Sequence, residues 1–283
     1  MRGVFLDNLF QRMEIDESIF FLTADMGINL VEKFEEKYPN RFLNVGIAEQ
    51  NLIGVAAGLA ESGMRPFVYT ISNFLVHRCL EQIRNDIVIH ELPVVLVGTS
   101  TGYDNGPLGP THHMLEDWGI ISNLAGMKIY APFNKESATN IFEKVSSAVG
   151  PSYVRIAKGE GNRNIINQSK VNKKTKLVIT YGSAVKSGIE FAESNNADLL
   201  IIDELGVGSF ASLDESCLTY SELIVVEDHF STTGMYSYVN QWTNARNLSI
   251  KVKSISPNNY SLNVGFEFND FLNDTKGIGD QMN

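Results

Sequence analysis

The residues with the clearest chemical potential are one glutamate and a pair of histidines. Glu49 stands just before an apolar stretch of mostly small residues at 52–60, and His112 and His113 end a loop rich in glycine and proline at 98–113. A carboxylate beside an apolar layer costs free energy unless it is paired or used, and histidine exchanges protons near neutral pH. The pattern therefore predicts proton transfer. The structural alternatives are a glutamate that complements a helix dipole and two histidines in a surface loop.

Glu49 is predicted to lie in the first turn of a helix. Residues 41–45 have the pattern of a strand, Gly46 permits a turn, and the stretch 52–60 continues as an apolar helix. Its small side chains allow another backbone to approach closely, so we expect this helix to pack tightly against a neighbour.

The two histidines follow a segment that is predicted to be a central strand. Residues 93–97 form a continuous apolar run, which is typical of a strand buried on both faces. Open α/β sheets bind ligands beyond the carboxyl ends of their strands, where the loop 98–113 begins. Without a nearby cysteine or a spaced third ligand, His112 and His113 are weak evidence for a metal, and no metal ligand is predicted in this chain.

The remaining helix of interest is predicted at residues 73–91. Asn73 is a good N-cap residue, and Phe74, Leu80, Ile83 and Ile87 are expected along one side of the helix.

The order of elements predicts an α/β fold with an open, mostly parallel sheet over residues 1–157. Residues 158–175 are polar and predict a linker, 176–265 predict a second, smaller α/β domain, and 266–283 predict a tail. Strands are predicted at 19–23, 41–45, 66–69, 93–97, 127–130, 152–156, 177–180, 199–202 and 223–226, and further helices at 28–38, 134–149 and 234–245.

Composition excludes several classes of protein. The chain has 283 residues and a net charge of −10, which argues against a nucleic-acid partner. It has no apolar run of membrane-spanning length and no signal-peptide pattern, so we expect a cytoplasmic protein without a membrane partner. Cys79 and Cys217 are too isolated for a disulfide framework or a thiolate metal site. Motifs for serine hydrolases, dinucleotides and phosphate loops do not occur.

Five segments resemble, in the same order, motifs of the thiamine-diphosphate enzymes of the transketolase family. The resemblance implies a thiamine-diphosphate pyrimidine-binding domain at residues 1–157 and a transketolase C-terminal domain at 176–265. The segments are Ala-Asp-Met-Gly (24–27), Gly-Ile-Ala-Glu-Gln-Asn with Gly-Val-Ala-Ala-Gly-Leu-Ala (46–60), Arg-Cys-Leu-Glu-Gln-Ile-Arg (78–84), Gly-Pro-Thr-His-His (109–113) and Val-Glu-Asp-His (226–229) with Gly234.

The resemblance implies roles for four residues near the cofactor. Glu49 would hydrogen-bond the ring nitrogen of the aminopyrimidine and favour its imino form, acting as a general acid. Phe74 would stack on that ring, and His77 stands where many transketolases carry a second aromatic residue. His112 would handle protons on the oxygen atoms of the substrate.

The resemblance also implies a site for the phosphate of a sugar-phosphate substrate. Arg2 and Arg155 align with phosphate-holding positions, a task suited to the guanidinium group, although Arg155 also fits a strand-end salt bridge. Asn29 and Ser100 stand where the family carries a phosphate-binding serine and histidine.

Two further positions depart from the family pattern. Leu108 replaces an acidic residue, and His113 replaces a glutamine. Because a lost hydrogen bond to a substrate hydroxyl usually means a different ligand, these changes predict an altered donor or acceptor sugar.

The Gly-Asp-Gly…Asn segment with which the family holds diphosphate and metal does not occur, and the chain begins where the pyrimidine-binding domain begins. We therefore expect the C-terminal subunit of a split transketolase, which transfers a two-carbon ketol unit between sugars or sugar phosphates only with its partner. An N-terminal subunit would hold the diphosphate of thiamine diphosphate and Mg²⁺ (or Ca²⁺). The small-residue helix would pack near a twofold axis in an α2β2 heterotetramer.

Three alternatives stay open. They are the beta subunit of the first component of a 2-oxo acid dehydrogenase, a fragment of a 1-deoxyxylulose-5-phosphate synthase, and a non-catalytic subunit that kept the fold. The Glu-Gln-Ile-Arg and Gly-Pro-Thr-His segments favour transketolase, and the presence of Glu49, Phe74 and His112 argues against loss of catalysis.

Overall fold

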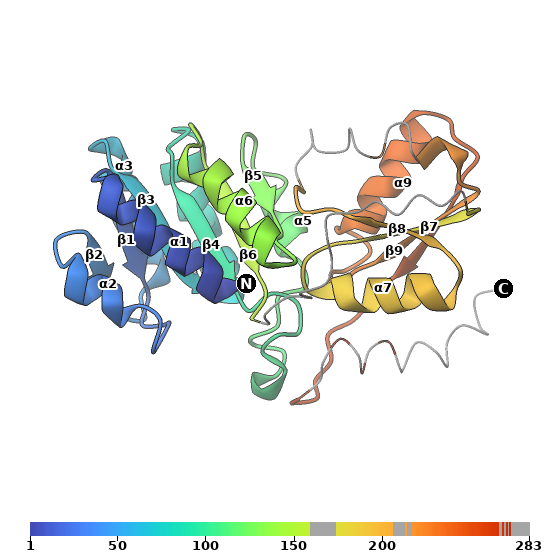
Figure 1. Ribbon diagram of the computed structural model, residues 1–283, viewed down its shortest axis with the longest axis horizontal. Helices are drawn as coiled ribbons and strands as arrows, with labels where there is room; N and C mark the ends of the chain where they lie inside the picture. The colour runs from blue at the N-terminus through green and yellow to red at the C-terminus, as the bar shows by residue number, and fades with distance from the viewer. Residues whose placement is uncertain are drawn as a thin grey trace.

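The computed structural model contains two parallel β-sheets side by side, each covered by helices (Figure 1). It describes residues 1–158, 174–205, 213, 217–265, 268, 270 and 272. The larger sheet has the strand order β2-β1-β3-β4-β6-β5 and the smaller one β10-β9-β7-β8. The predicted α/β fold with a parallel sheet is confirmed. The strands are β1 (Ile19–Thr23), β2 (Phe42–Asn44), β3 (Arg65–Ile71), β4 (Val95–Thr99), β5 (Lys128–Tyr130), β6 (Ser152–Ile156), β7 (Lys176–Thr180), β8 (Asp198–Ile201), β9 (Glu222–Val226) and β10 (Lys251–Ile255).

Helices cover both faces of the larger sheet because alternate strand residues point to opposite sides. On one face α1 and α6 lie side by side, joined by a hydrogen bond from Asn8 Nδ2 to Thr139 Oγ1 of 3.1 Å (Figure 1). On the other face α3 packs against α4. The helices are α1 (Arg2–Ile15), α2 (Glu32–Lys37), α3 (Glu49–Glu61), α4 (Ser72–Gln82), α5 (Asp117–Ile121), α6 (Lys135–Ser146), α7 (Val185–Ser194) and α9 (Met235–Ala245), with short turns η1 (Ile83–Val88), η2 (Gly106–Leu108), η3 (Gly182–Ala184) and η4 (Cys217–Thr219).

Most predicted strands agree with the structure to within two residues, but the helices α1 and α5 and the strand β10 were missed. The helix α1 buries Phe5, Leu9 and Met13 at helical spacing, and β10 is an edge strand with alternating exposure. The helix predicted at 28–38 begins only at Glu32. The predicted linker lies almost wholly outside the described residues, as does most of the predicted tail.

The prediction for the helix at 73–91 needs two corrections. The helix begins at Ser72 and becomes a π turn at η1, and Asn73 is not its N-cap: the Asn73 amide donates to the carbonyl of His113 at 2.6 Å. Phe74 and Leu80 do not share the buried side with Ile83 and Ile87. The buried line consists of Leu75, Val76, Cys79, Ile83 and Ile87.

The two sheets share a hydrophobic core at α5. Trp118 is buried, with its ring 5.4 Å from that of Tyr181 and stacked at 6.1 Å on that of Tyr238. Both tyrosines belong to the part of the chain that forms the smaller sheet. This cluster of buried hydrophobic side chains extends continuously from α3 and α4 into the smaller sheet. The smaller sheet therefore packs against the larger one in a defined position.

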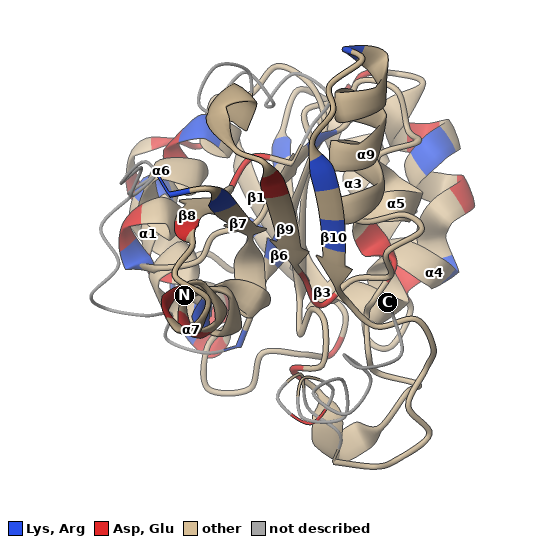
Figure 2. Ribbon diagram, turned by 90° about the vertical axis from the view of Figure 1, so that its right-hand side faces the viewer, with Lys and Arg blue, Asp and Glu red and all other residues tan. Residues whose placement is uncertain are grey.

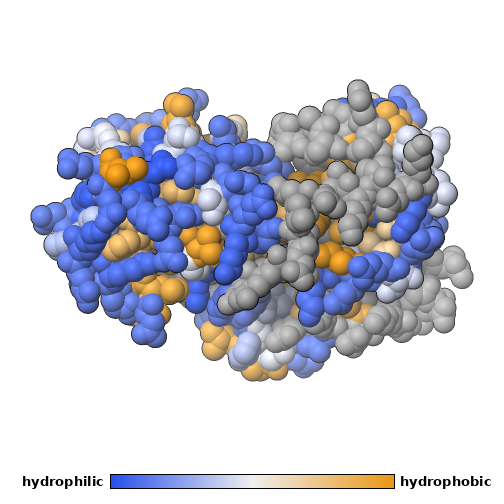
Figure 3. Space-filling view, in the orientation of Figure 1, coloured by the Kyte–Doolittle hydropathy of each residue, from blue (hydrophilic) through white to orange (hydrophobic). Residues whose placement is uncertain are grey.

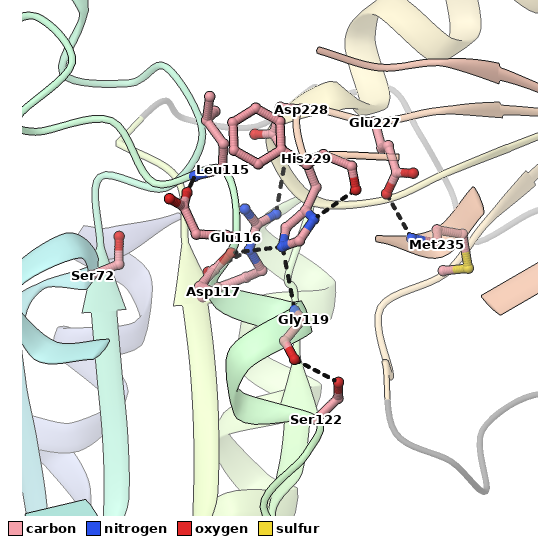
Figure 4. A network of polar contacts seen from close by, with 12 residues as sticks. Ser72, Leu115, Glu116, Asp117, Gly119, Ser122, Glu227, Asp228, His229 and Met235 are labelled. Atoms are coloured by element: carbon pink, nitrogen blue, oxygen red, sulfur yellow. Dashed lines mark hydrogen bonds and ion pairs between the residues drawn. The ribbon is translucent and has the colours of Figure 1, made fainter. Parts of the chain in front are cut away.

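A buried polar network lies beside this core (Figure 4). The Arg155 guanidinium is fully buried; its Nε donates to Asp117 Oδ2 at 2.9 Å and its Nη1 to Asp228 Oδ1 at 3.3 Å. Tyr153 also donates to Asp117, at 2.8 Å. Burial works to raise the pKa of Asp117, but the charges of Arg155 and His229 hold that pKa below its ordinary value. Of the two interpretations of Arg155, a phosphate contact or a salt bridge, this structure shows salt bridges, with Asp117 and Asp228.

The same network contains a buried acid that caps a helix. Glu227 accepts hydrogen bonds from the backbone N–H groups of Met235 and Tyr236, at 2.7 and 2.9 Å, and from the Tyr181 hydroxyl at 2.9 Å. The two backbone donors belong to the N-terminus of α9, where a carboxylate is favourable. Burial nevertheless raises the pKa of Glu227 to about 7. The motif at 226–229 therefore has a structural role at the junction of the two sheets.

Replacing Arg155 by methionine should lower the free energy of unfolding by about 3–5 kcal/mol, because Asp117 and Asp228 would stay buried without their counter-charge. Urea denaturation of the chain measures this loss. The matched control is Arg12→Met, since Arg12 forms a surface pair with Glu143 at 2.5 Å. That change should cost about 0–1 kcal/mol. Equal losses of unfolding free energy in both variants would show that the buried ion pairs of Arg155 contribute no more to stability than the surface pair.

Candidate functional site

Three of the residues singled out from the sequence meet at the carboxyl edge of the larger sheet. Glu49 begins α3 just after β2, Phe74 lies in the first turn of α4 after β3, and His112 lies in the loop after β4. All strands of this sheet are parallel, so the connections that follow them emerge at one edge. We call residues 100–113 the histidine loop.

The turn before Glu49 is held by a single amide side chain. Asn44 Oδ1 accepts from the backbone N–H of Gly46 at 3.0 Å and from that of Asp25 at 2.8 Å, so the connections after β2 and β1 are tied together. Gly46 has a φ of +74°, which favours glycine. This turn sets Glu49 at the start of α3, where its side chain is 4% exposed.

Glu49 and Phe74 are joined by Arg78, a residue to which the sequence assigned no role. Arg78 Nη1 donates to Glu49 Oε2 at 2.8 Å, and the Arg78 guanidinium carbon lies 3.8 Å from the centre of the Phe74 ring. The site thus holds a flat group with N–H donors between an aromatic face and a buried carboxylate. Phe74 and Arg78 are four residues apart on α4, so helical spacing alone could have predicted that their side chains lie side by side. Its pairing with Glu49, 29 residues away, has no local sequence signal.

His112 completes this cluster. Its ring lies 5.1 Å from that of Phe74, edge to face, and its Nδ1 lies 3.0 Å from the Thr111 hydroxyl. Burial lowers the pKa of His112, and the positive charges of Lys158 and Arg78 lower it further. His112 is therefore neutral at pH 7 and can accept a proton.

His113, the last residue of the histidine loop, is buried against Tyr103. It is 2% exposed, its ring lies 5.0 Å from that of Tyr103, and burial lowers its pKa. Neither ring nitrogen has a hydrogen-bond partner among the described residues, and the same holds for the side-chain hydroxyls of Ser100 and Thr101 and for Nδ2 of Asn105. Because a buried polar group without a partner costs about 1–3 kcal/mol, these atoms mark a place suited to a polar ligand or to water.

Two cations lie at the same edge. Arg2 begins α1. Burial raises the pKa of Tyr69 and the positive charge of Arg2 opposes this, whereas burial lowers the pKa of Lys158 and the charge of Arg2 lowers it further. Lys158 follows β6 and donates from Nζ to Asn105 Oδ1, while its backbone N–H donates to Asp104 Oδ2 at 2.7 Å. Burial raises the pKa of Asp104 to about 6. The sequence did not indicate Lys158, which is the first residue of the predicted linker.

Asn29 and His77 are the remaining predicted site residues. None of the contacts described above joins either of them to the cluster of Glu49, Arg78, Phe74 and His112. Asn29 is exposed on the connection after β1, with a φ of +65°, and its backbone N–H donates to Glu32 Oε1 at 2.8 Å. His77 Nε2 lies 3.7 Å from Glu116 Oε1. Within the residues that the structure describes, no three acidic, histidine or cysteine side chains are placed to bind a metal ion.

The family model described as "Transketolase, pyrimidine binding domain" matches residues 1–163. This match covers more than half of the 283 residues, so the chain belongs to the transketolase pyrimidine-binding-domain family. The resemblance inferred from the five motifs is thereby confirmed, and the family implies thiamine diphosphate as cofactor.

Individual relatives carry the likeness across both sheets. A "putative transketolase C-terminal section" from Methanocaldococcus jannaschii is 27% identical over 272 residues, which are 91% of this chain and 86% of that protein. The "6-deoxy-6-sulfo-D-fructose transketolase subunit SqwH" from Clostridium sp. (strain MSTE9) is 34% identical over 157 residues, 55% of this chain and only 49% of that relative. A solved structure described as "split gene transketolase, inactive beta4 tetramer" has a TM-score of 0.78 and 24% identity over 98% of this chain and 96% of its own. It shows the same fold.

No helix in the described part of the chain is both long and apolar enough to cross a membrane. Figure 2 shows acidic and basic residues interspersed along the helices of the larger-sheet part.

The pair of Glu49 and Arg78 should stabilise the chain by about 1 kcal/mol, because Glu49 is buried while Arg78 is 44% exposed and screened by solvent. Arg78→Met should therefore be destabilising, and Glu49→Gln in that background should recover part of the loss. A double-mutant cycle in urea measures the coupling. As control, Arg84→Met removes an exposed cation that donates a hydrogen bond to its neighbour Asn85, and should change stability by less than about 0.5 kcal/mol. A coupling of zero would contradict the ion pair.

Proposed function

We propose that this chain is one subunit of a thiamine-diphosphate-dependent transketolase and transfers a two-carbon ketol unit between sugars. The observation that carries the proposal is the way Glu49 and Phe74 together hold the guanidinium of Arg78. A guanidinium is flat, conjugated and rich in N–H groups, and so is an aminopyrimidine. A carboxylate beside an aromatic face is therefore suited to the pyrimidine half of the cofactor.

Arg78 has to leave this position when the cofactor binds. The movement is feasible because the Arg78 side chain is 44% exposed, and a half-exposed ion pair contributes little to stability. Glu49 cannot move in the same way, because it is fixed in the first turn of α3.

When bound, thiamine diphosphate supplies the carbon centre that receives the two-carbon unit. Glu49, whose side chain is buried, would hold a proton at the pyrimidine ring nitrogen. Phe74 orients the ring by stacking. His112, neutral at pH 7, accepts or returns a proton at a substrate hydroxyl oxygen.

The substrate that we infer carries an anionic group. Arg2 and Lys158 bring two positive charges to the sheet edge near the histidine loop, whereas Arg155 is neutralised at the junction of the sheets. The name of the clostridial relative specifies a sugar with a sulfo group, and a phosphate would carry comparable negative charge. We therefore propose a sulfonated or phosphorylated sugar, with Asn29, Ser100 and His113 as further polar contacts.

We also propose a partner subunit over this edge. Ile28, Ile47 and Leu108 follow β1, β2 and β4, and their side chains are 82%, 76% and 56% exposed. In the space-filling view, hydrophobic side chains protrude along the lower edge of the larger-sheet lobe, where the loop with η2 descends (Figures 1 and 3). The relatives described as a subunit and as a C-terminal section support a second chain, to which we assign the diphosphate and Mg²⁺.

The proposed α2β2 assembly has a matching surface on α3. A Cβ built on Gly54 or Gly58 would meet nothing within 4 Å, so this side of the helix is open to close approach by a second copy. The copies would then bring their two sites to the same central interface.

Glu49→Gln should reduce ketol transfer by the complex of this chain with its diphosphate-binding partner by about 10²–10⁴-fold, because glutamine cannot exchange a proton with the ring nitrogen. A coupled assay of aldose release measures the rate. The control is Glu61→Gln at the exposed end of the same helix, which should leave the rate unchanged. A fully active Glu49→Gln complex would refute a catalytic role and leave a subunit that kept only the fold.

The acid limb of the kcat/KM profile should lie below pH 6.5, the ordinary pKa of histidine, because His112 must be neutral to accept a proton and its pKa is lowered. Activity is then present above the lowered pKa and lost as the pH falls through it. His112→Gln should abolish this limb and reduce kcat/KM by about 10²-fold, whereas His90→Gln, on an exposed turn, should leave the profile unchanged. An unchanged acid limb in His112→Gln would assign the titration to another group.

A further inference from the structure

The histidine loop is held by contacts from the C-terminal part of the chain as well as by its own sheet. We call residues 260–265 the C-terminal strap. We propose that this strap and Asp228 together position the histidine loop and so place His112 beside Phe74. They act through the loop and do not touch substrate. The inference rests on the proposed function for its kinetic consequence, but its structural content can be measured separately.

The first contact is at the neck of the loop. Gly102 and Met114 close the neck with two backbone hydrogen bonds of 2.9 Å each. Gly102 has a φ of +57°, and a Cβ at this position would overlap the Asp228 carboxylate. Asp228 is itself fixed by Arg155 at 3.3 Å and by the Ser183 hydroxyl. The neck therefore packs against the Asp228 carboxylate, which cannot move without leaving the buried Arg155 cation with one partner fewer.

The second contact is at the tip of the loop. The Gly265 N–H donates to the Gly106 carbonyl at 2.6 Å, and the Val264 side chain lies over Gly109, where an added Cβ would be 3.5 Å away. Figure 1 shows this red segment beside the green loop that carries η2. The strap thus contacts the part of the loop that projects furthest from its sheet.

The third contact joins the strap to the helix that carries Phe74. The Tyr260 hydroxyl donates to the Glu116 carboxylate, which lies 3.7 Å from His77 Nε2 on α4. The Tyr260 ring packs edge to face on Phe230, with the ring centres 5.0 Å apart. Strap, loop end and α4 are therefore connected through one carboxylate, Glu116.

These contacts predict that the loop loosens when the C-terminal part is altered. The test uses the complete complex of this chain with its partner and two variants, Tyr260→Phe and Asp228→Asn. Tyr260→Phe keeps the aromatic packing and removes one hydroxyl, so it should fold even if Asp228→Asn does not. The matched control is Tyr220→Phe, which removes the buried hydrogen bond of Tyr220 to Asp198, 2.8 Å long, within the smaller-sheet part of the chain.

Hydrogen–deuterium exchange of residues 100–113 should become about three- to tenfold faster in each variant and stay unchanged in the control. The KM for the ketose donor should rise by about three- to tenfold, with cofactor affinity unchanged, because a misplaced His112 weakens substrate contacts and leaves the ring site intact.

Unchanged exchange in Tyr260→Phe, or equally faster exchange in Tyr220→Phe, would overturn the proposal. So would faster exchange with both KM and kcat unchanged. If the unmodified complex transferred no ketol unit, the proposed function would fail, and the exchange comparison alone would decide whether the C-terminal part holds the loop.

Discussion

The structure depends on one buried cation and the two acids that neutralise it. A charge without exposed surface is tolerated only when it is paired, since removing a partner costs several kcal/mol. Arg155 is satisfied by Asp117 at the start of α5 and by Asp228 after β9. These residues come from different parts of the chain, so pairing them draws the smaller sheet against the carboxyl end of β6. The position of Asp228 at the neck of the histidine loop follows from the same requirement.

The ion pair at the candidate site differs in the one property that matters for function, which is exposure. At the junction of the sheets, Arg155 and both of its acidic partners are buried. The Arg78 side chain, in contrast, is 44% exposed while it pairs with Glu49. A pair of this kind exchanges its partner at little cost, because solvent already screens the cation. The fold therefore combines a fixed ionic contact between its sheets with a replaceable one at the sheet edge, and the replaceable contact lies where a ligand can enter.

Local patterns predicted much of this structure, and long-range pairing limited the rest. The bounds of β1 and β6 agree with the strands predicted at 19–23 and 152–156, and Glu49 lies in the first helical turn as expected. Arg155 was left between two interpretations because its partner Asp228 is 73 residues away. No local pattern could show that the smaller sheet would bury it. The role of Arg78 was hidden for the same reason, since Glu49 belongs to a different helix.

The misassigned side of α4 shows how an incorrect prediction can still point to a site. Leu75, Cys79, Ile83 and Ile87 recur every four residues and form the buried stripe, which leaves Phe74 out of phase with it. A large aromatic ring outside the buried stripe of a helix leaves apolar surface exposed, which is unfavourable unless something covers it. Here Arg78 and His112 cover the ring, and both are polar. An out-of-phase aromatic residue at the carboxyl edge of a parallel sheet is therefore better interpreted as part of a binding surface than as core.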